Sequence, residues 1–196
     1  MVKRFIAGCA VAALPLAVYA APESYTLDPY HSFLQFEAEH LGMSKMRGRF
    51  DKTVGKFMID RAAKTASVEI TVQTASISTG DSDKGSRPRS RDEHLRSPDF
   101  FNVAEFPTMT FKSTKVIFNG DNPQTIEGEA TMLGVTKPLT LRVENWRCGP
   151  HPANKKEMCG GNASGTMKRS DYGMKFLIPA VSDEQKLWIE MEGYKD

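Results

Sequence analysis

The sequence predicts an all-β fold, an antiparallel barrel of eight strands with one short helix. Three observations lead to this prediction. Apolar and polar side chains alternate in about eight runs, turn residues separate these runs, and a single stretch carries the signals that start a helix. The runs lie at residues 34–40, 54–59, 67–73, 109–118, 125–132, 139–144, 163–169 and 187–192. Short strands with short connections are typical of sandwiches and barrels.

The first 20 residues predict a cleaved signal peptide that is not part of the fold. Two basic residues precede an apolar run, which ends with Val18 and Ala20 at the positions that a signal peptidase reads. Cleavage after Ala20 leaves residues 21–196 as one domain. The apolar run is shorter than the roughly 20 residues of a membrane-spanning helix, so we expect no stable membrane anchor. The alternative, lipid attachment at Cys9, would leave the signal with almost no hydrophobic stretch.

The charge of the chain argues against a nucleic-acid partner. The sequence has 26 basic and 24 acidic residues, and the first 20 residues contain two of the basic ones and no acidic one. The mature chain is therefore formally neutral and has no general attraction to phosphate polyanions. A local basic cluster at Arg87, Arg89 and Arg91 lies among small and acidic residues, which is more typical of a solvated loop.

Two cysteines remain after cleavage of the signal. Cys148 and Cys159 flank a loop rich in Gly, Pro, Asn and Lys between two strand-like runs. In an oxidising compartment such a pair is expected to form a disulfide, which would stabilise one long hairpin by about 3 kcal/mol. The alternative is a metal site formed by Cys148, His151 and Cys159, for which the sequence offers no recognisable fourth ligand.

The alternation within each run separates an inward face from an outward face. Leu34, Phe36 and Ala38 share one face of the first run, while the residues between them are polar. The side chains that we expect to line the interior are Leu34, Phe36, Ala38, Val68, Ile70, Val72, Phe100, Phe101, Met109, Phe111, Leu139, Leu141, Leu187 and Ile189. These residues could equally form a solid core, because packed interiors are the rule in proteins.

A barrel is favoured over a sandwich by the size of several inward residues. Gly128, Ala130, Ala163 and Gly165 are small and are expected to leave space rather than to fill it. Eight strands give a barrel interior that is either packed with side chains or just wide enough for one small ligand. The sequence pattern does not choose between these two possibilities.

The predicted helix and the segment after it interrupt the strands. Ser90 and Glu93 have the spacing of a capping box, and Pro98 ends the helix within about two turns. The next residues are too aromatic for a solvated loop, and they include Phe100, Phe101, Val103 and Phe106. We expect this segment to form a plug or rim over the mouth of a barrel that holds an apolar ligand.

Several motifs in one order resemble those of the YceI-like family. They are YTLD at 25–28, HS at 31–32, RGRF at 47–50, RDEHL at 91–95, DFF at 99–101, FP at 106–107, TFKS at 110–113, GVTK at 134–137 and RSDYG at 169–173. The resemblance covers nearly the whole mature chain. The long loop at 79–90 and the cysteine hairpin depart from the family pattern, and both would alter the rims of the barrel.

The resemblance implies a lipocalin-like barrel, export to the periplasm and non-covalent binding of a long isoprenoid, either a polyprenyl lipid or a quinone. Such a tail in water costs about 0.8 kcal/mol per CH₂-sized group, so a dry interior would favour its transport. Polar residues at one end would then contact the head group. The candidates are His31, Ser32, Arg91, Asp92 and His94. Alternatively, these residues only brace the helix or turn the chain into a strand.

We expect no enzyme, no metal and no covalent cofactor. The sequence has no G-x-S-x-G elbow, no H-E-x-x-H motif and no glycine-rich phosphate loop. A hydrolase that uses His31, Asp92 and His94 is the catalytic alternative. The non-catalytic alternative is an interaction or stress protein with a filled barrel. A homodimer and transient membrane contact are partner assignments that the sequence leaves open.

Overall fold

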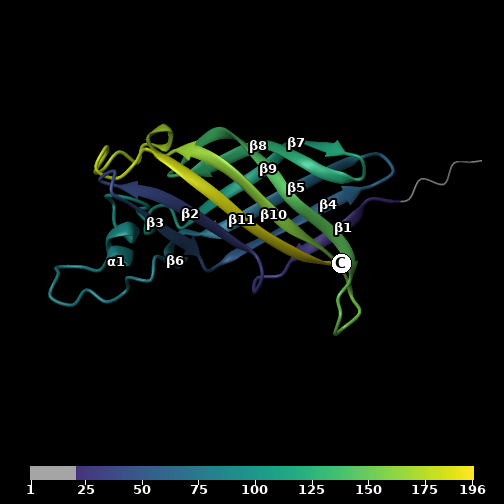
Figure 1. Cartoon of the computed structure of the whole chain (residues 1–196), viewed down its shortest axis with the longest axis horizontal. Helices are drawn as coiled ribbons and strands as arrows, with labels where there is room; N and C mark the ends of the chain where they lie inside the picture. Colours follow the sequence, from purple (N-terminus) through teal and green to yellow (C-terminus); the bar gives the residue numbers. More distant parts are fainter. Residues whose placement is uncertain (1–20) are drawn as a thin grey trace, which may run out of the picture.

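The computed structural model describes residues 21–196, so the predicted signal peptide and Cys9 lie outside the described residues. This part of the chain is dominated by strands (Figure 1). The strands are β1 (Glu23–Leu27), β2 (Phe33–His40), β3 (Ser44–Phe50), β4 (Thr53–Asp60), β5 (Thr65–Gln73), β6 (Ile77–Ser78), β7 (Thr108–Asn119), β8 (Asn122–Met132), β9 (Val135–Pro150), β10 (Glu157–Lys168) and β11 (Glu184–Lys195). The helices are α1 (Arg91–Arg96) and the 3₁₀ turns η1 (Thr74–Ser76) and η2 (Arg169–Tyr172).

Eight of these strands close an antiparallel barrel, which confirms the predicted fold. The order around the barrel is β1-β4-β5-β7-β8-β9-β10-β11, and β11 pairs with β1 to complete the ring. Because the ring is closed, most of the backbone of these eight strands is paired with a neighbouring strand. Unpaired strand edges are the places where open sheets aggregate, and closure removes most of them.

Strand β11 changes partner along its length. Its first half, from Lys186 to Glu190, pairs with β2, while its last residues, from Gly193 to Lys195, pair with β1. The sheet then continues from β2 to β3 and β6. This extension and α1 lie at one end of the elongated barrel, and the C-terminus lies at the opposite end (Figure 1). We call these the helix end and the C-terminal end.

The alternating pattern located eight strands correctly and missed β1, β3 and β6. Strand β6 has only two residues, too few to show alternation. Strand β3 carries polar or charged residues at most positions and includes Gly48, which gave no apolar stripe to detect. Gly48 has a packing reason, because a Cβ there would lie 2.6 Å from the Phe36 ring.

Helix α1 has the predicted capping box. The Ser90 hydroxyl accepts a hydrogen bond from the Glu93 N–H, and the Glu93 carboxylate accepts one from the Ser90 N–H. The helix ends before Pro98, with Ser97 in an extended conformation. After it, Phe101 is buried and its ring meets the Phe50 ring edge-on at 5.3 Å, so this segment packs against the barrel at the helix end.

The Cys148–Cys159 disulfide is present, as predicted. The two residues are directly opposite each other in β9 and β10, with a Cα–Cα distance of 4.0 Å. The strands continue past the disulfide, so the connecting loop is limited to residues 151–156. Because the two sulfur atoms are bonded to each other, the alternative metal site with His151 has no thiolate ligands.

Two of the four small residues predicted to leave space in the interior, Gly128 and Gly165, do not leave it. A Cβ on Gly128 would lie 2.5 Å from the Phe111 ring, and one on Gly165 would lie 2.9 Å from the Leu141 side chain. Neighbouring large side chains therefore occupy the space above both glycines. Ala130 and Ala163 do face cavities.

No helix within residues 21–196 combines the length and the apolar character needed to cross a membrane.

Candidate functional site

Four apolar cavities lie in the interior of the barrel that residues 21–196 form. The rim cavity, of ≈ 70 Å³, lies beside Leu95, Phe100 and Phe101 at the helix end. The central cavity is the largest, with ≈ 90 Å³. The side cavity, of ≈ 30 Å³, lies beside Ala163. The far cavity, of ≈ 20 Å³, lies beside Phe57.

Shared side chains separate each cavity from the next. The wall between the rim and central cavities consists of Leu34, Met109, Met132, Met167 and Leu187. The central and side cavities share Ile70, Phe111, Leu141, Ile189 and Met191. The side and far cavities share Val68, Ile126, Trp146 and Met191. The four cavities therefore form one row, interrupted only by side chains.

Methionine is prominent in these walls. Seven of the ten methionines of the chain line at least one cavity: Met46, Met58, Met109, Met132, Met167, Met174 and Met191. Methionine is unbranched and has three rotatable side-chain bonds, so it adapts to a ligand more readily than leucine or valine. Three of the five side chains between the rim and central cavities are methionines, so rotation of these three is the motion that would join those two cavities.

All fourteen side chains predicted to line the interior do face one of these cavities. Nine lie at the central cavity, and the remaining five lie at the rim or side cavity. Their contact with a ligand stays a prediction. The sequence pattern identified Met109 but overlooked Thr53, Tyr172 and the other six cavity-lining methionines, although Met132 and Met191 lay in phase with predicted inward residues.

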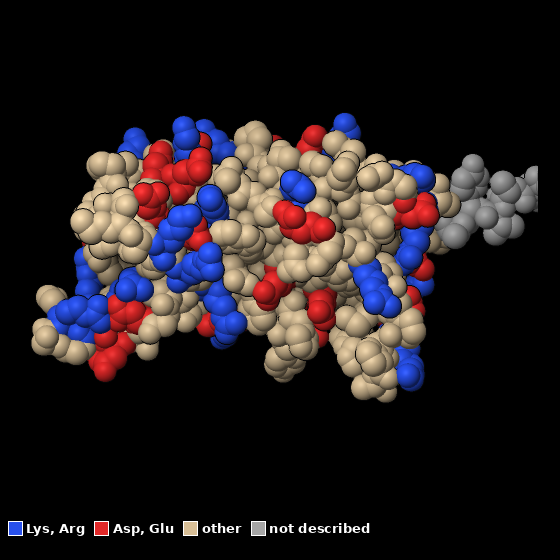
Figure 2. Space-filling model, viewed as in Figure 1, with Lys and Arg blue, Asp and Glu red and all other residues tan. Residues whose placement is uncertain are grey.

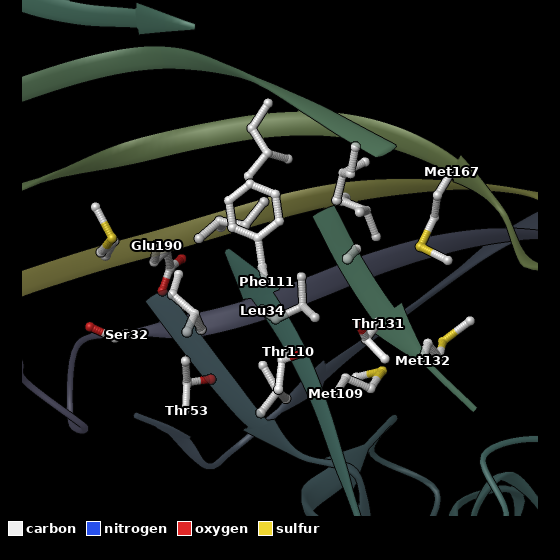
Figure 3. Close-up of a pocket in the computed structure, with 18 of the residues that line it drawn as sticks. Ser32, Leu34, Thr53, Met109, Thr110, Phe111, Thr131, Met132, Met167 and Glu190 are labelled. Atoms are coloured by element: carbon white, nitrogen blue, oxygen red, sulfur yellow. The ribbon is translucent and has the colours of Figure 1, made fainter. Parts of the chain in front are cut away.

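Few polar side chains reach the central cavity. Figure 3 shows Ser32 and Thr53 on one side of it and the sulfur atoms of Met109, Met132 and Met167 on the other. The Ser32 hydroxyl is engaged with the backbone of Glu192, donating to its carbonyl at 3.0 Å and accepting from its N–H at 3.2 Å. The Thr53 hydroxyl is buried and has no hydrogen-bond partner among residues 21–196.

The rim cavity contains one buried cation, Arg169. Burial lowers the pKa of its guanidinium, and the residue as a whole is only 3% exposed. Its donors are taken by backbone carbonyls, including those of Phe176 at 2.8 Å and Val181 at 2.9 Å. Arg169 therefore holds the 174–182 loop against the barrel, and these bonds leave it little capacity to bind an anion.

A second group of polar residues lies outside the barrel, where β1 ends and β2 begins. His31 Nδ1 lies 2.8 Å from a carboxylate oxygen of Asp28, and this hydrogen bond raises the pKa of His31. Burial alone would raise the pKa of Asp28, but the hydrogen bonds from His31 and the Tyr30 N–H hold it below its usual value. Ligand atoms of Asp28, His31 and Glu192 lie within 4.8 Å of one another, a spacing that could admit a metal ion.

His31 also lines an outer groove of ≈ 520 Å³. This groove shares Trp146, Gly161, Asn162 and Met191 with the side cavity inside the barrel. It lies on the outer face of β9, β10 and β11, near the register shift between Asn162 and Ala163.

Of the five predicted head-group residues, only Ser32 lines an interior cavity. Asp92 is buried and accepts hydrogen bonds from the Thr79 N–H and hydroxyl, which ties α1 to the preceding loop. Arg91 lies on the exposed face of α1, 3.6 Å from the Asp81 carboxylate. His94 bonds to Asp99 at 2.9 Å and packs edge-on against the Phe100 ring.

The catalytic cluster considered from the sequence is not assembled. His31, Asp92 and His94 have separate partners, and within residues 21–196 they do not form a group of neighbouring ligand or acid–base atoms. The interior itself is almost entirely apolar, an arrangement that favours binding of an apolar molecule over proton transfer.

Comparisons of the sequence with known proteins all indicate the same family. Residues 25–193 match the model of the YceI-like domain. A UPF0312 protein of Pseudomonas aeruginosa (strain LESB58) is 36% identical over 199 residues, which cover 100% of both chains. Protein YceI of Escherichia coli O157:H7 is 36% identical over 195 residues, or 97% of each chain.

Solved structures share the fold. The Campylobacter jejuni YceI protein has a TM-score of 0.63 at 27% identity and covers 81% of this chain and 90% of its own. BcnA of Burkholderia cenocepacia has a TM-score of 0.68 at 20% identity, covering 85% and 98%. A polyisoprenoid binding domain from Saccharophagus degradans, implicated in plant cell wall breakdown, has a TM-score of 0.63 at 17% identity, covering 89% and 99%. The last two establish similarity of fold alone.

Proposed function

Because the chain belongs to the YceI-like family, we propose that it is a periplasmic carrier that holds a long-chain isoprenoid, a polyprenyl lipid or a quinone, inside the barrel. The observation that carries this proposal is the row of four apolar cavities along the barrel. A linear prenyl chain is narrow, apolar and flexible, and it matches a row of small compartments better than a compact ligand would. The polyisoprenoid binding described for the Saccharophagus degradans domain supports the same ligand class.

The cavities as they stand hold only part of such a chain. The central cavity has ≈ 90 Å³, whereas pockets for drug-sized ligands are usually about 300–1,000 Å³. The methionines shared by the rim and central cavities would have to rotate to admit the tail. A ligand that must separate these side chains binds with less net free energy, which suits a protein that also releases its cargo.

The periplasmic location is part of the proposal. The Cys148–Cys159 disulfide agrees with an oxidising compartment, and the first 20 residues have the sequence pattern of a secretory signal. We further propose a binding role rather than catalysis, because the interior offers apolar contact surface and few groups able to transfer protons.

Transient membrane contact would deliver the ligand. Four exposed apolar side chains lie at the helix end: Leu41, Met43, Phe176 and Leu177. The Leu41 N–H donates to the Ala180 carbonyl at 2.7 Å, so the β2–β3 turn and the 174–182 loop lie side by side, as Figure 1 also shows. Figure 2 shows uncharged atoms at this end beside acidic and basic side chains.

We call these four residues the apolar rim. They adjoin the rim cavity, because residues close to them in the sequence line it. Met46 follows the β2–β3 turn, and Met174 and Val181 belong to the 174–182 loop. A lipid surface is the occupant that this continuity favours, because a prenyl tail could pass from the bilayer into the cavity without crossing water. Replacement of Met43 and Leu177 by serine is expected to slow ligand uptake from vesicles. Replacement of the exposed Val54, which lies in β4 and lines none of the four cavities, by serine is the matched control.

Fluorescence of Trp146 provides a direct test of ligand binding. Trp146 lines both the side and far cavities, and the other tryptophan of the chain, Trp188, can be replaced by phenylalanine. A prenylated quinone bound in the row of cavities is expected to quench Trp146 fluorescence in a saturable manner, with one site per chain. The same quinone without its prenyl tail is the control, and it should quench Trp146 weakly. No saturable quenching and no retained ligand would favour the alternative, an interaction protein with a filled barrel.

A further inference from the structure

The Thr53 hydroxyl is an exception within an otherwise satisfied interior. Thr53 is 4% exposed, and its Oγ1 atom is the one buried side-chain oxygen or nitrogen without a hydrogen-bond partner in residues 21–196. Buried polar groups in folded proteins nearly always have partners, so an orphaned hydroxyl calls for a functional explanation. A valine of the same shape would fill the position without an unpaired oxygen.

The fold directs this hydroxyl into the central cavity. Thr53 is the first residue of β4 and pairs with Val72 of β5. It lies in phase with Phe57 and Ile59, which are buried inside the barrel, and side chains an even number of residues apart in a strand share one face. Thr53 accordingly lines the central cavity and none of the other three (Figure 3).

The surroundings of the hydroxyl restrict the kind of group that could bond to it. Within residues 21–196, no lysine or arginine lines the central cavity. The one ionisable carboxylate in its lining, that of Glu190, accepts a hydrogen bond at 2.6 Å from the amide of Gln35. An anionic phosphate placed here would lose its hydration and gain no cation, which is strongly unfavourable. An uncharged oxygen would lose little and would gain the hydrogen bond that Thr53 lacks.

We infer that Thr53 forms a hydrogen-bonding subsite in the central cavity for a single uncharged oxygen atom of the ligand, a quinone carbonyl or a prenol hydroxyl. This inference rests on the proposed function and narrows its ligand class. The oxygen-bearing head group lies among the side chains of the central cavity, and the tail extends along the row of cavities. A polyprenyl phosphate could not use this subsite.

The test compares two ligands that differ only in the oxygen-bearing group. The dissociation constants of a prenylated benzoquinone and of a linear polyprenyl hydrocarbon of equal tail length are measured by displacement of a prenylated fluorescent probe. Three chains are compared: wild type, Thr53→Val and Thr53→Ser. Serine keeps the hydroxyl, whereas valine keeps the shape. Loss of the donor leaves the ligand oxygen buried and unpaired, so Thr53→Val is expected to weaken quinone binding about tenfold.

The hydrocarbon has no oxygen, so its affinity reports only on the apolar cavities and distinguishes a lost hydrogen bond from a change in their shape. Thr53→Val is expected to bind the hydrocarbon as tightly as wild type, and Thr53→Ser to bind the quinone nearly as well as wild type. Equal quinone affinities of wild type and Thr53→Val, or equal losses for both ligands, would overturn the subsite while leaving the carrier function in place. Failure of the wild-type chain to bind either prenyl compound would overturn the carrier function, and the subsite with it.

Discussion

Partial filling of the central cavity is expected to weaken binding of a long prenyl chain. Ala130 lines this cavity from β8, and its neighbour across the strands is Phe111 of β7. Leucine at this position adds three carbon atoms to a space of ≈ 90 Å³. Because the central cavity lies between the rim and side cavities, the added side chain would block the row at its widest point.

The expected loss of affinity follows from the part of the prenyl chain that the leucine side chain would displace. Exclusion of one isoprene unit exposes about five CH₂-sized groups at about 0.8 kcal/mol each, or about 4 kcal/mol in total. The released unit regains conformational freedom, which offsets about 1 kcal/mol. A net loss of about 3 kcal/mol corresponds to an affinity about 100-fold lower. A ligand with only two isoprene units could avoid the central cavity and should lose far less.

The assay is a titration of Ala130→Leu with long-chain and two-unit prenyl quinones, read by Trp146 fluorescence. Ala104→Leu is the matched control, because Ala104 is exposed on the segment after α1. Thermal unfolding and circular dichroism verify that the barrel is intact, since an overpacked core is itself destabilising. A folded Ala130→Leu chain that binds the long-chain quinone as tightly as wild type would refute the assignment of the row of cavities as the binding site of the prenyl chain.

Three further predictions concern stability and protonation. Replacement of Cys148 and Cys159 by serine should lower the free energy of unfolding by about 3 kcal/mol, as measured by denaturant titration; an unchanged midpoint would show that the disulfide does not constrain the unfolded chain. Thr53→Val should raise the free energy of unfolding of the ligand-free protein by about 1–3 kcal/mol, because it removes an unpaired buried oxygen; a decrease would show that the hydroxyl is satisfied in the folded protein. In NMR titration, the pKa of His31 should lie above its ordinary value of 6.5 and should fall in Asp28→Asn. The stabilising contribution of protonated His31 is then complete below pH 6.5 and is lost as the pH rises through the higher folded-state pKa, whereas a titration midpoint at or below 6.5 would contradict the pairing.

The fold could be predicted because its signals are local. Alternation over two residues identifies a half-buried strand, and the Ser90–Glu93 spacing identifies a helix start, without knowledge of distant contacts. The same alternation predicted twelve of the fourteen lining residues that face cavities, and the aromatic segment after α1 supplied Phe100 and Phe101. The missed strands were short or lacked an apolar stripe, as in β6 and β3.

The polar part of the site could not be predicted because the role of a polar side chain depends on which partners the fold places within hydrogen-bonding distance of it. His31 and Asp92 stand in motifs that resemble those of the YceI-like family, yet their side chains bond to Asp28 and Thr79 and support the local fold. The Thr53 hydroxyl is distinguished by the absence of a partner, which no sequence pattern displays. The space above Gly128 was misjudged for a similar reason, because the Phe111 side chain that fills it comes from the neighbouring strand.

Native mass spectrometry of the protein, isolated from its own cells without detergent, tests the central claim most directly. The proposed function predicts one bound molecule per chain, released by organic solvent, whose mass and fragmentation identify a prenyl chain; the Thr53 subsite further predicts that its head group is uncharged and carries oxygen. Protein that carries no lipid and takes up none when prenyl quinones or polyprenyl lipids are added would contradict it.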